Sequence, residues 1–146
     1  MIDCPDLPVP AADLMKAAED ARRFSYMPYS HFAVGAALLG RSGRMYTGCN
    51  IESASFSPTN CAERTALFKA VSEGERDFAA LAVTGGPAGK PGVFCAPCGV
   101  CRQMLSEFCA PEMPVILGAV GKLQVYTLGE LLPLAFGPRD VLPDHA

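Results

Sequence analysis

The sequence predicts an α/β fold, a three-layer α/β/α arrangement around a five-stranded mixed sheet. Apolar residues recur at helical or strand-like spacing in segments that follow the order αββαβαββ. Half of the 146 residues are apolar and 18% are charged, which provides enough apolar surface for a core and argues against disorder. No linker, internal repeat or low-complexity tract separates the segments, so we expect a single domain over residues 1–146.

The N-terminal part predicts one amphipathic helix and a β-hairpin. The helix is expected over 11–27, where Pro28 ends the periodic run. Small apolar residues at 33–39 and a second run at 45–51 predict two strands, and Ser and Gly within 41–44 supply the turn between them. The apolar positions of the helix are Leu14, Ala17, Ala18, Ala21 and Phe24.

Two further helices and three strands are expected after a polar loop. Asn60 is a suitable N-cap for a helix over 61–73, and Pro97 suits the first turn of a helix over 98–109. Thr127 resembles the cap of a short helix near 129–132. The three strands are predicted at 78–84, 114–120 and 123–127.

Charge and composition narrow the class of function. The net charge of −3 and the lack of a Lys/Arg run argue against nucleic acid as a partner and favour a small neutral substrate. The N-terminus has no basic and apolar signal pattern, and no run approaches the ~20 apolar residues of a membrane span, so we expect a cytoplasmic protein with no membrane partner. In a reducing compartment, closely spaced cysteines among the seven present indicate metal binding rather than disulfides.

Cys61, Cys98 and Cys101 form the most informative pattern. Each lies at the predicted start of a helix, where the helix dipole and free N–H groups stabilise the thiolate that binds metal. Cys98 and Cys101 share one helical turn, so both sulfurs can face one point, and Cys61 supplies a third ligand from another helix. Soft sulfur ligands favour Zn²⁺ over Mg²⁺ or Ca²⁺.

Glu63 makes this zinc site a candidate catalytic centre. Three protein ligands leave the fourth tetrahedral position to water, as in catalytic sites. Glu63, two residues after Cys61, can reach that water without binding the metal, and a carboxylate beside an acidified water is suited to hydrolytic attack on an electrophilic ring carbon.

Structural alternatives exist for the same residues. Cys95 extends the spacing to Cys-x-x-Cys-x-x-Cys, which with Cys61 would make a closed four-thiolate zinc site, but such a site leaves Glu63 without a role. An iron–sulfur site needs a further cysteine near residue 105, which is Leu105. Glu63 by itself would be a favourable charge in a first helical turn.

The combination Cys-x-Glu and Pro-Cys-x-x-Cys resembles the zinc deaminase signature in its all-cysteine form. The resemblance extends over nearly the whole chain to the small homotetrameric cytidine deaminases. It implies hydrolytic deamination of cytidine and 2′-deoxycytidine in pyrimidine salvage, by zinc-bound hydroxide with Glu63 as the proton shuttle. It also implies one Zn²⁺ per subunit and a homotetramer with shared active sites. The similar blocks are residues 28–37, 48–52, 61–66 and 130–138.

The resemblance also assigns roles to individual residues. Phe32 would pack on the pyrimidine, and Asn50 and Glu52 would bind the ribose hydroxyls. The backbone N–H of Ala62 would bind the pyrimidine O2. The remaining two assignments are Arg64, which would donate to the zinc thiolates and offset their excess negative charge, and Phe136, which would reach a neighbouring subunit's pocket.

Two positions depart from the family pattern. Ala96 stands where the family usually has serine, and Phe56 stands where tyrosine is common, which puts substrate contacts or subunit packing in question rather than the metal. Two alternative functions stay open at this point. One is a deaminase of another aminated heterocycle, against which Asn50 and Glu52 argue, and the other is a non-catalytic, zinc-stabilised binding module.

Overall fold

The computed structural model describes residues 6–142, so the outer limits of the expected domain over 1–146 lie outside the described residues. Its centre is one five-stranded mixed sheet with the strand order β2-β1-β3-β4-β5. The strands are β1 (Phe32–Gly40), β2 (Met45–Cys49), β3 (Phe78–Pro87), β4 (Pro114–Ala119) and β5 (Lys122–Thr127). The helices are α1 (Ala11–Ala21), α2 (Ala62–Ser72), α3 (Gly99–Phe108) and α4 (Leu128–Leu131), with short 3₁₀ turns at Arg22–Phe24 and Pro138–Asp140.

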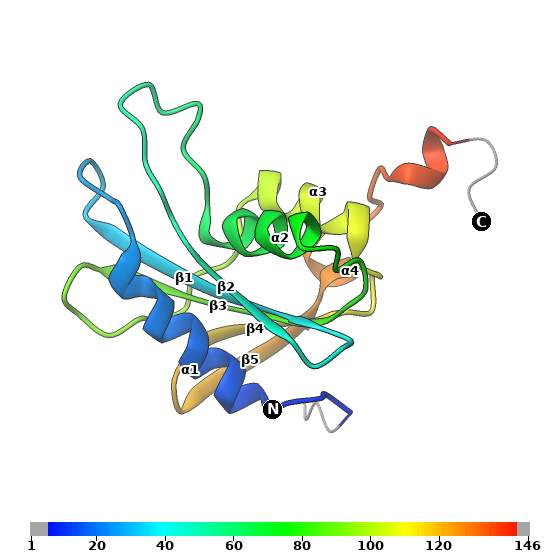
Figure 1. The fold of residues 1–146 in the computed structure, drawn as a ribbon, viewed down its shortest axis with the longest axis horizontal. Coiled ribbons are helices and arrows are strands. Elements are labelled where there is room, and N and C mark those ends of the chain that lie inside the picture. The colour runs from blue at the N-terminus through cyan, green and yellow to red at the C-terminus, as the bar shows by residue number, and fades with distance from the viewer. Residues whose placement is uncertain (1–5, 143–146) are drawn as a thin grey trace.

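The helices cover both faces of the sheet, which confirms the predicted three layers. Helix α1 lies on one face, and α2 and α3 lie side by side on the other (Figure 1). Because side chains alternate along a strand, neighbouring residues of β1 belong to different cores. Leu38 packs in the cluster beneath α2, whereas Ala37 and Leu39 pack in the cluster beneath α1.

Sheet pairing explains why β3 is longer than predicted. The strand continues three residues beyond Thr84 because Gly85, Gly86 and Pro87 pair with the beginning of β1, where Pro87 lies opposite Phe32. The pairs β1–β2, β1–β3 and β4–β5 are antiparallel, and β3–β4 is parallel. Helix α3 therefore lies in the crossover between two parallel strands, as the order of elements requires.

The predicted first helix is too long. It ends at Ala21, followed by the 3₁₀ turn, instead of continuing to residue 27. The reason is tertiary: Tyr26 donates its backbone N–H to Asn50 O (3.0 Å) and forms a parallel bridge with Ile51. Phe24 was expected on the buried face but is 67% exposed, beneath the guanidinium of Arg23.

The predicted start of α2 and α3 is shifted by one position. Cys61, not Asn60, is the N-cap of α2, and the Asn60 amide donates instead to Thr65 Oγ1 (3.1 Å). In the same way Cys98 is the N-cap of α3, so Pro97 precedes the helix rather than entering its first turn. The short helix near 129–132 is confirmed as α4, where Thr127 and Glu130 form a capping box.

Candidate active site

The three predicted ligand cysteines meet at one point between the N-termini of α2 and α3. The Sγ atoms of Cys61, Cys98 and Cys101 all lie within 4.8 Å of one another. The Cys61–Cys98 separation is 3.7 Å and the Cys98–Cys101 separation is 3.5 Å. Within residues 6–142, this is the one group of His, Cys, Asp or Glu side chains whose ligand atoms converge as a metal site requires.

The spacing of the sulfurs fits zinc. Zn–S bonds of about 2.3 Å in a tetrahedron place the sulfurs about 3.8 Å apart, close to the observed separations. A disulfide needs about 2.05 Å, so the three thiols are free. Cys101 is buried and Cys98 is exposed, which leaves one side of the group open.

Cys95 is not part of this group, contrary to the closed four-thiolate alternative. Its Sγ lies 3.0 Å from where a Cβ on Gly85 would stand, next to the ring of Phe32. Burial raises the pKa of the Cys95 thiol to about 11, and the charges of Glu63 and Cys61 add to that shift. Cys95 therefore packs as a neutral thiol in the wall of the site.

Helix α2 reaches its position because β2 carries a glycine where the two elements cross. A Cβ at Gly48 would lie 2.4 Å from Ala62 O and 2.5 Å from Ala66 N. Both atoms are helix backbone and cannot yield without moving the helix. Gly48 therefore lets the first turn of α2, which bears Cys61 and Glu63, lie directly on the sheet.

Glu63 is buried next to the sulfurs. The residue is 3% exposed, and this burial raises the pKa of its carboxyl to about 7, while a hydrogen bond with Cys101 opposes the rise and the charge of Cys61 adds to it. A carboxyl with a pKa near neutrality can both accept and return a proton at the same pH.

Arg64 supplies positive charge to the sulfur group. Its Nη2 donates to Cys61 Sγ at 3.4 Å. The pKa of Cys61 falls to about 5, because the Cys101 thiol donates to its thiolate; burial opposes that effect and Arg64 adds a further hydrogen bond. The Nε of Arg64 is buried without an acceptor among the described residues. This arrangement suits a guanidinium that offsets the −1 charge of Zn²⁺ with three thiolates.

Asn50 and Glu52 hold the segment that leads into β1. The Asn50 amide donates to Phe32 O (2.8 Å) and accepts from Val34 N (2.9 Å). It therefore makes the pair of hydrogen bonds that a backbone peptide group of a neighbouring strand would make. The Glu52 carboxylate accepts from the backbone N–H of Tyr29 (3.0 Å) and Ser30 (3.1 Å) and from the Ser30 hydroxyl. The hydrogen bond from the Ser30 hydroxyl is the main cause that lowers the pKa of Glu52.

The sequence did not predict that Asn50 and Glu52 hold the backbone before and at the start of β1. No local sequence pattern signals these hydrogen bonds. Each side chain keeps unused hydrogen-bonding capacity, since a carboxamide has two N–H groups and a carboxylate about four acceptor positions. Both therefore remain able to contact a ligand while they shape the rim of the site.

The other predicted site residues lie at two different places. Phe32 begins β1 and is 37% exposed beside Cys95, and Ala62 is the first residue of α2, where its N–H has no acceptor within the helix. Phe136 is 63% exposed in a C-terminal segment, residues 133–142, that extends away from the sheet (Figure 1). Among the described residues, one hydrogen bond joins Phe136 to the rest of the protein: Gln103 Nε2 donates to the Phe136 carbonyl oxygen (2.8 Å).

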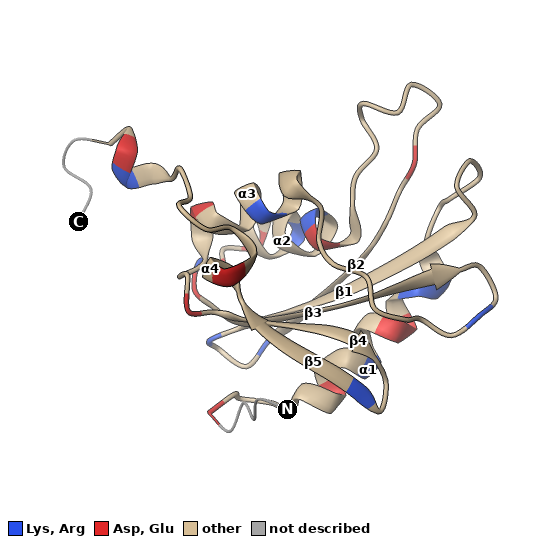
Figure 2. Cartoon of the chain, turned by 180° about the vertical axis from the view of Figure 1, so that it is seen from behind, with Lys and Arg blue, Asp and Glu red and all other residues tan. Residues whose placement is uncertain are grey.

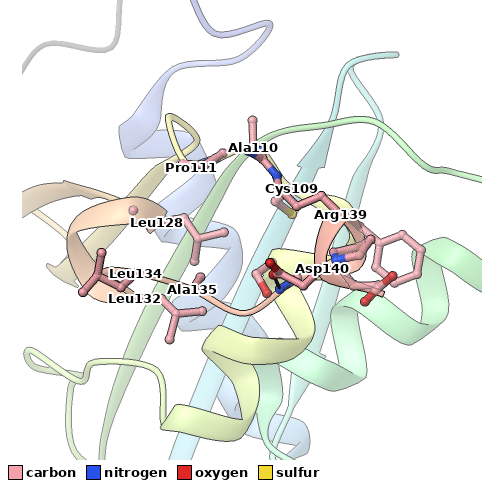
Figure 3. Close-up of a pocket in the computed structure, with 15 residues that line it drawn as sticks. Cys109, Ala110, Pro111, Leu128, Leu132, Leu134, Ala135, Arg139 and Asp140 are labelled. Carbon is pink, nitrogen blue, oxygen red and sulfur yellow. Dashed lines mark hydrogen bonds between the residues drawn. The ribbon is translucent and has the colours of Figure 1, made fainter. Parts of the chain in front are cut away.

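A separate cavity of about 580 Å³ lies beside this C-terminal segment. Figure 3 shows it between the end of α3, α4 and the segment, with Leu128, Leu132 and Leu134 on one side and Arg139 and Asp140 on the other. No predicted site residue lines it. The chemistry of the thiols and Glu63 is therefore not located in this hollow.

Comparisons with known proteins agree on one family. A family model described as the cytidine and deoxycytidylate deaminase zinc-binding region matches residues 10–117. A cytidine deaminase of Sporosarcina psychrophila is 50% identical over 129 residues, which cover 88% of this chain and 92% of that protein. The crystal structure of cytidine deaminase from Burkholderia pseudomallei matches with a TM-score of 0.79 and 46% identity over 88% of this chain and 100% of that one. The structure of the Mycobacterium tuberculosis enzyme matches with a TM-score of 0.71 and 38% identity over 86% of this chain and 96% of that one.

Proposed function

The chain belongs to the zinc-dependent cytidine and deoxycytidylate deaminases, and we propose that Glu63 and the three thiolates beside it carry out the hydrolytic deamination of cytidine and 2′-deoxycytidine. The observation that carries this proposal is the convergence of three sulfurs next to one buried carboxyl. A non-catalytic module or a deaminase of another heterocycle is not favoured, since relatives that share half of the residues over most of the chain are cytidine deaminases.

Cys61, Cys98 and Cys101 are the residues that would hold the zinc ion. When bound there, zinc supplies a Lewis acid with one open position, which makes water nucleophilic near neutral pH. Arg64 offsets the excess negative charge of the three thiolates, because its guanidinium donates a hydrogen bond to Cys61 Sγ.

Glu63 moves the protons of the reaction. It accepts one proton from the attacking water and delivers it to N3 of the cytosine ring, which makes C4 more electrophilic. The water oxygen bonds to C4, and Glu63 takes the remaining proton of that hydroxyl and passes it to the amino group. As C4=O forms the C4–N bond breaks, and ammonia leaves with uridine, or 2′-deoxyuridine from 2′-deoxycytidine, as the other product. Burial favours this role, since a carboxyl with a pKa near 7 exchanges protons in both directions.

The nucleoside would lie against the wall formed by the start of β1. We place the base on the Phe32 ring, with its O2 on the free N–H of Ala62 at the N-terminus of α2. Asn50 and Glu52, already fixed by their backbone contacts, would bind the ribose hydroxyls. A free nucleoside also suits the charges, since acidic and basic residues are interspersed along the elements (Figure 2) and the net charge is −3.

We further propose a homotetramer in which neighbouring subunits complete each active site. Phe136 supports this assembly, because it is an exposed aromatic residue in a segment that leaves its own sheet. Localisation in the cytoplasm and a role in pyrimidine salvage go with this function. Within residues 6–142 no helix has the length and apolar character to cross a membrane.

The substitution Glu63→Gln tests the function. It removes the proton carrier but keeps the size of the side chain, so zinc content stays at one per subunit and ammonia release from cytidine falls about 10²–10⁴-fold. Zinc quantification and ammonia release from both nucleosides measure the two effects, and Glu112→Gln, in an exposed turn, is the matched control. Normal zinc content with retained ammonia release in Glu63→Gln would overturn the assignment.

A further inference from the structure

The ion pair Glu19–Arg22, at the end of α1, lies behind the wall of the active site, with Arg22 buried and Glu19 partly buried. Arg22 is 6% exposed, and its Nη1 lies 2.7 Å from Glu19 Oε1. Each nitrogen of the guanidinium donates to a backbone carbonyl as well. These acceptors are Ala33 O (2.8 Å, from Nε), Lys90 O (2.9 Å, from Nη1), and Gly86 O (3.0 Å) and Pro87 O (3.3 Å), both from Nη2.

The carbonyls belong to the place where β1 and β3 meet at the site. Ala33 follows Phe32 directly, and in the sheet register Ala33 lies opposite Gly86 and Phe32 lies opposite Pro87. One planar guanidinium therefore joins the first residues of β1 to the last residues of β3. These hydrogen bonds hold the backbone directly after Phe32 and the strand residue that lies opposite it.

Glu19 fixes the loop that leads to Cys98. Its Oε2 accepts from the backbone N–H of Gly92 at 3.1 Å. The next residue, Val93, pairs with Gly85 in both directions, through N–O distances of 2.8 and 3.3 Å. The chain then passes Cys95, packed at Gly85 beside Phe32, and reaches Cys98.

Glycine allows the loop to lie this close to the pair. A Cβ at Gly92 would lie 2.5 Å from Glu19 Oε2, and a Cβ at Gly86 would lie 3.3 Å from Arg22 Nη2. Burying an ion pair costs desolvation free energy, and apolar side chains of the same size often give equal or greater stability. Five directed hydrogen bonds, in contrast, specify where five acceptors lie relative to one another.

We propose that Glu19 and Arg22 are positioning residues for the proposed deaminase reaction, which set the Phe32 wall, the end of β3 and the loop up to Val93 from the opposite face of the sheet. The inference rests on the proposed function, since it assigns Phe32 to the base. Neither residue touches the three sulfurs or Glu63 through a hydrogen bond, so the pair acts on nucleoside binding and not on zinc.

Two conservative variants test this role in the zinc-loaded enzyme. Arg22→Lys keeps the charge but has three donors on one nitrogen in place of the planar fork, and Glu19→Gln keeps the shape but loses the charge. In both, KM for cytidine rises about tenfold, because small displacements of binding groups have large effects, while zinc content and kcat change little. Backbone amides of Gly85, Gly92 and Val93 exchange hydrogen faster than in the wild type.

Two controls separate positioning from general stability. Asp20→Asn removes an exposed partner of Lys16 on the same helix and leaves KM unchanged. Leu14→Val weakens the core beneath α1 without touching the loop, and it lowers the melting temperature with KM unchanged. An equal rise of KM in Leu14→Val at an equal loss of melting temperature would overturn the inference, and so would an unchanged KM in both pair variants.

Ammonia release by the wild-type enzyme distinguishes a failure of the proposed function from a failure of the inference about Glu19 and Arg22. If it releases no ammonia from cytidine, the proposed function is wrong, and the positioning role in that reaction is overturned with it. If it deaminates cytidine while the pair variants keep wild-type KM and amide exchange, the inference about Glu19 and Arg22 alone is wrong.

Discussion

At the scale of single residues, the position of each cysteine in its element decides what it does. Cys61 and Cys98 are N-caps, and Cys101 lies in the first turn that follows Cys98, so the three sulfurs point to one place at two helix N-termini. Cys95 has the same spacing from Cys98 that Cys98 has from Cys101, yet it lies outside any helix, in the segment before α3. Spacing by itself therefore does not distinguish a ligand from a wall residue, and secondary structure does.

The two kinds of cysteine give opposite results on substitution. Cys98→Ser replaces a zinc thiolate by a poor zinc ligand, so we expect the bound zinc to fall well below one per subunit. Cys95→Ser changes a neutral thiol outside the ligand group, and zinc stays at one per subunit. Elemental analysis of both purified variants measures this. Zinc loss in Cys95→Ser equal to that in Cys98→Ser would instead support the closed four-thiolate site.

At the scale of the elements, local chemistry was sufficient where neighbours in sequence make the contacts. The apolar run at 33–39, the run at 45–51 and the turn residues between them predicted β1 and its hairpin partner β2 to within two residues at each end. The capping residue Thr127 predicted α4, since both partners of its capping box lie within four residues. The three thiols and Glu63 were also predictable, because their chemistry depends on residue type at helix starts.

Sequence reasoning failed where a distant segment makes the contact. The end of α1 depends on Arg22, which turns its side chain to carbonyls more than ten residues away, and on Tyr26, which pairs with β2's continuation at Ile51. The backbone roles of Asn50 and Glu52 were missed for the same reason, as their partners lie 16 to 23 residues earlier. A pattern of spacing within one segment does not include such partners.

The crossing of α2 over β2 gives a prediction at this scale. In Gly48→Ala the new methyl group meets helix backbone at about 2.4 Å, so α2 must shift and carry Cys61 and Glu63 with it. We expect the free energy of unfolding to fall by about 1–3 kcal/mol, together with a loss of bound zinc. Thermal unfolding and zinc content measure the two effects.

The control for this substitution is Gly40→Ala in β1. The three nearest atoms to its methyl group all belong to the Glu75 side chain, whose end can move aside, so zinc stays bound. Full zinc occupancy in Gly48→Ala would mean that the close contact does not position the first turn of α2.

At the scale of the whole molecule, exposed apolar side chains gather at two places on the described surface. The C-terminal segment carries Leu134 (104% exposed), Phe136 (63%) and Val141 (65%), and the rim near the site exposes Tyr29 and Phe56. The rings of Tyr29 and Phe56 pack edge to face with centroids 5.8 Å apart, which joins two rim loops. Apolar groups at both places favour burial between subunits.

If the chain forms the proposed homotetramer, mixed tetramers test whether a neighbouring subunit supplies Phe136. Subunits with Glu63→Gln lack the proton carrier but have Phe136, and subunits with Phe136→Ala have the reverse. If Phe136 acts in a neighbour's pocket, random mixing gives about a quarter of the sites an intact Glu63 and an intact neighbouring Phe136. Ammonia release therefore rises well above the sum of the two parent tetramers.

The matched control mixes Glu63→Gln with Cys98→Ser, two changes in the same subunit's site, which leaves no intact site and gives no recovery. A Phe136 mixture that behaves like this control would show that each subunit works with its own Phe136 or without it, and would contradict the shared site.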